Sequence, residues 1–173
     1  TWSLEHIHAQ NALGLNTVDQ WSEWLRLHRN ALESLPEIDV ADRARLESEI
    51  DAAIPEITEE RFHELEEALA PHFAPRGTGT AEEDEHGIAN LALLDSRDNS
   101  ALSNSMFEVK RIAVLERDRA GSYIPICTRH VFLKYYTEEH SQQLHYWSLQ
   151  DRDGYLAAIE RELGPYLQDG DDK

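Results

Sequence analysis

The chain has 173 residues, 40% of them hydrophobic, which suits one folded domain with its own core and excludes a disordered chain. It carries one cysteine, Cys127, which excludes an internal disulfide and any cysteine-based zinc cluster. There are 34 acidic and 16 basic residues, a formal net charge of −18, so the free chain should be repelled by nucleic acid.

The cellular compartment can be predicted from the signals that the sequence lacks. Every apolar run falls far short of the ~20 residues that a membrane span needs, and the N-terminus has no signal-peptide pattern. Together with the single cysteine, this predicts a cytoplasmic protein that does not enter a membrane. Because the chain begins at Thr1 without methionine and a chemical motif follows at once, we expect a fragment of a longer protein.

Residues 2–10 predict a short strand that leads into a loop, and three helices follow before residue 75. The capping-box pattern Thr17-Val-Asp-Gln20 opens the first helix, and prolines end each of them. The predicted helices and the prolines that end them are residues 17–35 before Pro36, Val40–Ile54 before Pro55, and Thr58–Ala70 before Pro71 and Pro75. Residues 1–76 hold 16 acids against 6 bases, so we expect residues 17–75 to form an acidic three-helix insert, with its glutamates facing solvent and a structural role.

Weaker signals mark the middle of the chain. Residues 76–87 are rich in glycine, threonine and acids, which predicts a mobile loop. The apolar run Ile88–Leu94 fits a buried strand, and the Asp, Asn and Ser side chains of residues 95–104 favour a turn. A helix is predicted from about residue 104 to Arg119.

The C-terminal third adds a turn and helix within residues 123–136 and a last helix over Tyr155–Leu163, interrupted by Gly164-Pro165. The whole pattern predicts a mainly helical α+β domain. The aromatic core candidates outside the insert are Trp2, Phe107, Phe132, Tyr136 and Trp147.

The pair Glu5-His6 carries the first chemical signal. A regular strand would turn Glu5 and His6 to opposite faces and place His6 and His8 on one face. A sharp bend after Glu5 would instead bring the carboxylate and the imidazole side by side. A carboxylate suits a hard cation such as Mg²⁺, and an imidazole suits a general base near neutral pH.

Two asparagines supply the second signal. Asn99 offers an uncharged oxygen ligand at the start of a helix, and Asn90 could brace a loop through side-chain to backbone hydrogen bonds. Either residue also has an ordinary interpretation, since asparagine before a helix is commonly an N-cap.

These segments resemble a known family. Glu5–Gln10 is similar to the E-H-I-x-P-Q segment of HNH-type nucleases, also called His-Me finger or ββα-metal nucleases. Ala89–Asp95 is similar to the family's G-N-L-x-L-L-D segment, and Asn99–Arg111 to its N-x-x-x-S-N-x-x-F-x-x-K-R segment. The resemblance covers about a fifth of the chain, and its nearest branch is the C-terminal domain of GmrSD-type modification-dependent restriction proteins and of SspE.

The resemblance implies a small ββα-metal finger and a role for each matching residue. His6 would be the general base and Asn90 would pin the loop that carries it. Asn99 and Glu5 would ligate Mg²⁺, with Mn²⁺ as a substitute. The implied reaction is hydrolysis of a DNA phosphodiester, one strand per visit, so the elementary act would be a nick.

Partners follow from the same resemblance and from the charge. Lys110 and Arg111 are expected to contact DNA phosphates near the site. An N-terminal domain of the parent protein, which would hydrolyse nucleotide and recognise modified DNA, is expected to deliver the substrate in anti-phage restriction. Ala9 replaces the family's proline, and the acidic insert lengthens the usual short connection between His6 and Asn90.

Two other interpretations stay open. His6 and His8 could form a transition-metal site completed by His63, His72 or His86. Alternatively, the domain is a non-catalytic acidic helical interaction module that binds a basic partner. Cys127 lies in an apolar context and is expected to be an inert thiol.

Overall fold

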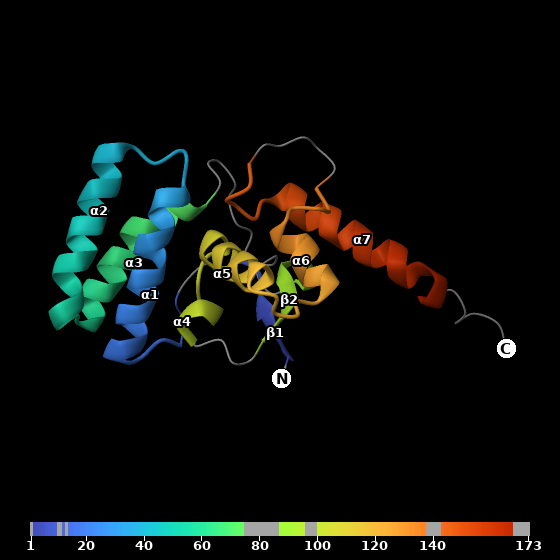
Figure 1. The fold of residues 1–173 in the computed structure, drawn as a ribbon, viewed down its shortest axis with the longest axis horizontal. Helices are drawn as coiled ribbons and strands as arrows, with labels where there is room; N and C mark the ends of the chain where they lie inside the picture. The colour runs from blue at the N-terminus through green and yellow to red at the C-terminus, as the bar shows by residue number, and fades with distance from the viewer. Residues whose placement is uncertain are drawn as a thin grey trace.

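The computed structural model describes residues 2–9, 12, 14–74, 87–95, 100–137 and 143–167. The fold is α+β and mostly helical, as the sequence predicts. Three helices gather at one end of the molecule, a two-stranded sheet and the helices that follow it lie in the middle, and the last helix extends to the other end (Figure 1). No helix in the described ranges is long and apolar enough to cross a membrane.

The three helices of the insert are α1 (Val18–Ala31), α2 (Val40–Ala53) and α3 (Glu59–Phe73). Each begins at a side-chain cap, supplied in turn by Thr17, Asp39 and Thr58. Short 3₁₀ turns at Leu32–Ser34 and Ile54–Glu56 extend the first two helices. The three helices lie close to the ranges that the sequence predicts.

Pro71 does not end α3, although the sequence pattern predicts that it would. The helix continues through Pro71 to Phe73. Phe73 is fully buried and its ring meets the ring of His28 at 5.3 Å, so core packing holds the last turn in place. This contact offsets the backbone hydrogen bond that a proline removes.

The insert packs around Trp24, which is fully buried. Its indole stacks on His28 with ring centroids 3.5 Å apart and meets Phe62 edge-on at 5.4 Å. The same core includes Leu102, Met106 and Val109 from beyond the insert. The insert therefore shares one core with the segments that follow the strands.

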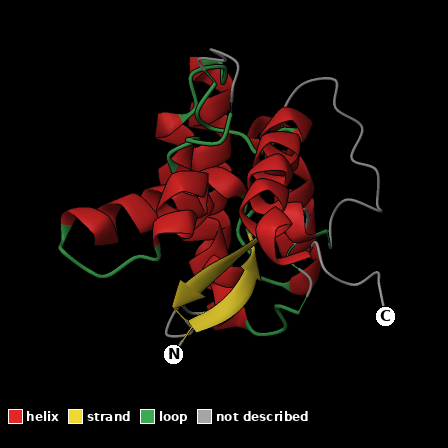
Figure 2. Cartoon of the chain, turned by 90° about the vertical axis from the view of Figure 1, so that its right-hand side faces the viewer, coloured by secondary structure: helices red, strands yellow, loops and turns green. Residues whose placement is uncertain are grey.

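Strand β1 (Trp2–His6) pairs antiparallel with β2 (Leu91–Asp95), from Trp2 opposite Asp95 to His6 opposite Leu91. Figure 2 shows the two strands crossing at one edge of the helical body. Ala92 and Leu94 face inward and are buried, whereas Leu4 and Leu93 face outward and are exposed. The predicted strand at Ile88–Leu94 begins later than expected, because Ile88–Asn90 forms a 3₁₀ turn.

Beyond the strands come α4 (Ser100–Ser103), α5 (Phe107–Arg119) and α6 (Ile126–Phe132). Gly121 ends the α5 segment with φ +78°, a conformation that favours glycine. A second core joins the strands to these helices through Ile7, Ala92, Leu94, Phe107, Val114, Ile124, Val131, Phe132, Trp147 and Tyr155.

The last helix, α7 (Leu149–Leu167), is longer than the predicted Tyr155–Leu163 at both ends. Ser148 and Asp151 exchange hydrogen bonds at its start, where the Ser148 amide donates to the Asp151 carboxylate and the Asp151 amide donates to the Ser148 hydroxyl. This reciprocal cap starts the helix six residues early. Gly164 and Pro165 do not interrupt it.

Two of the five aromatic core candidates are placed differently from the prediction. Phe107, Phe132 and Trp147 are buried, but Trp2 is 41% exposed and Tyr136 is only partly buried. Trp2 stands at the end of the two-stranded sheet, opposite Asp95, and its ring contacts the exposed Tyr123 rather than the second core.

Gly154 brings α7 against the segment after α6. A Cβ at Gly154 would overlap the carbonyl oxygen of Tyr136 and lie 3.2 Å from its carbonyl carbon. We expect Gly154→Ala to lower the free energy of unfolding by about 3 kcal/mol, because backbone must shift on one side. Gly164→Ala in the same helix meets nothing within 4 Å and should raise it by up to ~1 kcal/mol. Urea unfolding of both variants checks this, and equal effects would contradict it.

Candidate functional site

The site is built where β1 ends and β2 begins. The Ile7 amide donates to the Asn90 carbonyl at 2.7 Å, which extends the strand pairing by one step beyond His6. Asn90 is fully buried, and its side chain makes two hydrogen bonds to the backbone of His8. Its Oδ1 accepts from the His8 amide at 3.1 Å and its Nδ2 donates to the His8 carbonyl at 3.0 Å. The side-chain amide of Asn90 thus holds the loop that follows His6.

Helix α5 holds the same loop from the other side. The ammonium group of Lys110 donates to the His6 carbonyl at 2.5 Å, and the Phe107 amide donates to Nδ1 of His8 at 3.2 Å. His6 is therefore fixed through its own carbonyl and through the residues that follow it.

His8 has a structural role in this fold, because its ring accepts a hydrogen bond from the start of α5. Burial, and then the positive charges of Lys110 and Arg152, lower the pKa of His8 to about 3. Its Nδ1 atom is occupied by the Phe107 amide, so the ring is neutral at physiological pH. The predicted sharing of one strand face by His6 and His8 does not occur, because the strand ends at His6 and the chain bends at residues 7 and 8.

His28 in α1 accepts a hydrogen bond from Met106, the residue before Phe107, in the same way that His8 accepts one from Phe107. Its Nδ1 donates to the Trp24 carbonyl at 2.8 Å, which leaves Nε2 to accept the Met106 amide at 3.3 Å. Burial lowers the pKa of His28 to about 3, against the opposing effect of the Trp24 hydrogen bond. Met106 has no side-chain cap of its own, so two neutral histidines cap the start of α5.

Glu5 and His6 stand at consecutive positions of β1, opposite Ala92 and Leu91. Both side chains are half-buried. The chain stays extended through His6, so the sharp bend considered after Glu5 is absent and their side chains leave opposite faces of the strand. The Glu5 carboxylate accepts a hydrogen bond from the Ser3 hydroxyl at 2.8 Å, on the same face.

Of the two metal ligands that the resemblance implies, the structure describes only Glu5. Glu5 is a hard oxygen donor of the kind that Mg²⁺ prefers. Asn99, the second expected ligand, lies outside the described residues, as do His86 and residues 76–86 of the predicted mobile loop. In the described ranges no group of three or more His, Cys, Asp or Glu side chains could hold a metal.

Lys110 does not fit the DNA contact predicted for it. The residue is 1% exposed and its ammonium group is directed to the His6 carbonyl, so it does not reach a phosphate at the surface. Arg111 keeps 17% of its side chain exposed and pairs with the fully buried Glu108 at 3.4 Å. Arg111 is the one member of this basic pair that reaches the surface.

Sequence reasoning missed the capping histidines, although their signals are visible. His28 falls on the inward stripe of α1 with Trp24 and Leu25, where a polar side chain needs a buried partner. His8 follows the motif histidine by two residues. Neither position reveals that the shared partner is the start of α5, about a hundred residues from His8 along the chain.

Comparison of this chain with protein-family models, with curated proteins and with solved structures finds no match.

Proposed function

We propose that this chain is a metal-dependent DNA endonuclease of the HNH type that nicks one strand at a time. The observation that carries the proposal is the hydrogen-bonded bracket of Asn90 on His8, which fixes the loop directly after His6. The motif resemblance assigns this duty to Asn90. The antiparallel strand pair that precedes the helical segment supports the same interpretation.

His6 acts on the attacking water in this proposal. Its imidazole removes a proton from water as the oxygen attacks phosphorus, and the bond to the leaving sugar oxygen breaks, with that oxygen taking a proton from solvent. The products are one phosphate end and one hydroxyl end. Asn99 would hold Mg²⁺ or Mn²⁺, which would supply positive charge against the phosphate. Glu5 leaves β1 on the face opposite to His6, so its side chain would have to turn toward His6 to act as the second ligand.

Substrate delivery needs help from outside the chain. Lys110 is buried and Arg111 is paired with Glu108, so within the described residues this basic pair offers little positive charge to DNA, and the chain has a net charge of −18. Binding of DNA by this chain alone should be weak and fall steeply with salt. We propose that a recognition domain of a longer parent protein, in a modification-linked restriction system, presents the DNA.

Nicking of supercoiled plasmid in Mg²⁺ or Mn²⁺ tests the proposal. Replacing His6 by Ala removes the base, and we expect the rate of nicking to fall about 10²- to 10⁴-fold. His72→Ala, in α3 of the insert, is the matched control and should nick like the unchanged chain. Asn99→Ala and a chelator should also abolish nicking.

Equal nicking by the His6 and His72 variants would overturn the assignment of His6. If the chain and its full-length parent both leave plasmid intact, with recognised DNA supplied to the parent, the nuclease proposal fails.

A second candidate, the acidic interaction module, is favoured by the surface of the insert. Four of its five arginines are paired with acids, among them Arg29 with Asp51 and Arg61 with Glu64, both at 2.7 Å. Further acids remain exposed at Glu56, Glu59, Glu60 and Glu67. A magnesium-independent complex with a basic partner, unchanged in His6→Ala, would support this function.

A further inference from the structure

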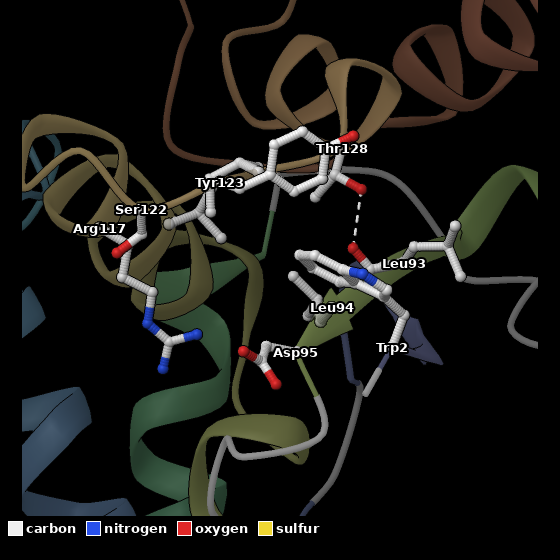
Figure 3. A pocket seen from close by; sticks show the side chains of 10 residues that line it. Trp2, Leu93, Leu94, Asp95, Arg117, Ser122, Tyr123 and Thr128 are labelled. Atoms are coloured by element: carbon white, nitrogen blue, oxygen red, sulfur yellow. Dashed lines mark hydrogen bonds between the residues drawn. The ribbon is translucent and has the colours of Figure 1, made fainter.

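A pocket of about 500 Å³ opens at the end of the strand pair opposite to His6. Trp2 and Asp95 form this end of the sheet, and the pocket continues to Val114 and Arg117 of α5 and to Tyr123 (Figure 3). Its volume lies within the range of small-ligand sites, roughly 300 to 1,000 Å³. Trp2 and His6 are four residue steps apart along the strand, about 13 Å at 3.3 Å per step.

One wall of the pocket is aromatic and accessible. The rings of Trp2 and Tyr123 meet edge to face, with centroids 5.8 Å apart and an interplanar angle of 71°. Trp2 is 41% and Tyr123 75% exposed, whereas Trp21, Trp24 and Trp147 are all buried. Exposed aromatic faces beside a pocket are the usual platform for stacking an unpaired base.

The opposite wall carries charge of both signs. Figure 3 shows the Arg117 guanidinium group across the pocket from Trp2, with the Asp95 carboxylate between Trp2 and Arg117. The carboxylate would repel a phosphate, so the pocket is not an anion site. Together the two groups place both signs of charge on one wall, and such a polar wall suits the polar edge of an uncharged, flat nucleobase better than it suits a phosphate.

The floor of the pocket is apolar, which suits the flat face of a nucleobase. Leu94 and Val114 are buried at 4% and 3% exposure and belong to the second core, so the floor is fixed. The Thr128 hydroxyl donates to the Leu93 carbonyl at 2.8 Å and ties α6 to β2 beside the pocket. Rigid walls of this kind favour a ligand that is itself rigid and flat.

We propose that this pocket binds an unpaired nucleobase of the DNA strand whose phosphate lies at His6, a few nucleotides along that strand. The inference rests on the proposed nuclease function. It adds a substrate requirement, namely that the strand must be single or locally unpaired on one side of the cut.

Binding without cleavage tests the pocket directly. Trp2 is the one exposed tryptophan among the four in the chain, so quenching of tryptophan fluorescence by a single-stranded DNA oligonucleotide, with chelator and at low salt, reports on it. We expect Tyr123→Ala to weaken binding about 10-fold, the scale of one lost stacking contact. Tyr166→Ala is the matched control, because Tyr166 is 85% exposed and lies in α7.

An abasic strand of the same length carries the same phosphates without bases. It should bind more weakly than the normal strand and be insensitive to Tyr123→Ala. If the normal strand fails to quench, or if the Tyr123 and Tyr166 variants bind it equally, the pocket proposal is overturned. Base-dependent binding in a chain that leaves plasmid intact, alone and in its full-length parent, would keep the pocket and reject the nuclease proposal.

Discussion

Lowering the pH from 7 to 5 is expected to reduce the free energy of unfolding by about 4 kcal/mol, because His8 and His28 are buried in their neutral form. The pKa of each is lowered to about 3 in the folded chain, from 6.5. The unfolded chain therefore binds more protons between these values, so this contribution is complete above pH 6.5 and is lost as the pH falls toward 3. Urea unfolding at a series of pH values measures the slope.

Replacement of both histidines separates their effect from that of the many carboxylates. Asn at position 8 and Gln at position 28 each retain an acceptor for the start of α5 but do not titrate. The double variant, His8→Asn with His28→Gln, should be less stable at pH 7 and should lose most of the pH dependence between 7 and 5. An unchanged slope in this variant would show that other groups cause the acid sensitivity.

The sequence predicted the start of a helix correctly where the capping side chain lies next to that start in the sequence. Thr17 and Thr58 sit where hydroxyl caps are expected, and both accept an amide three residues on. Pro71 misleads because its helix is held by the buried Phe73, and α7 starts early because Ser148 and Asp151 cap each other. Proline and glycine indicate only that the local backbone disfavours a helix. Burial of neighbouring side chains and helix caps can override that preference.

The candidate site was also predictable only where the signal is local in the sequence. The resemblance assigned Asn90 to a loop-bracing duty, and the structure gives it two hydrogen bonds to His8. Lys110 was misjudged because a lysine on a short amphipathic stretch is normally a surface residue. Its burial depends on the His6 carbonyl, which lies 104 residues away in sequence and is therefore invisible to any local pattern.

The insert is tied to the candidate site by bonds that sequence patterns do not predict. His28 of α1 accepts the Met106 amide, and the Trp24 indole donates to the Asn104 carbonyl at 3.0 Å. Glu66 of α3 accepts the amide of Ala12, in the segment between His8 and α1. Perturbation of the insert should therefore reach the loop after His6, which supports its expected structural role.

Replacing Asn90 by Ala should have the largest effect of any single change at the site. It leaves the amide and the carbonyl of His8 without their side-chain partner in a buried place, at about 1–3 kcal/mol for each group. We expect the free energy of unfolding to fall by about 4 kcal/mol, and nicking to fall further than the loss of folded chain accounts for. Urea unfolding and plasmid nicking on the same preparation measure both effects.

Asn90→Asp distinguishes the two bonds of the bracket. An aspartate can still accept the His8 amide through Oδ1 but, when ionised, it cannot donate to the His8 carbonyl, and its charge is buried. Asn30→Ala on the exposed face of α1 is the control and should change stability by less than about 0.5 kcal/mol. If Asn90→Ala were as mild as Asn30→Ala, the bracket would not be what holds the loop, and the proposed function would lose the observation that carries it.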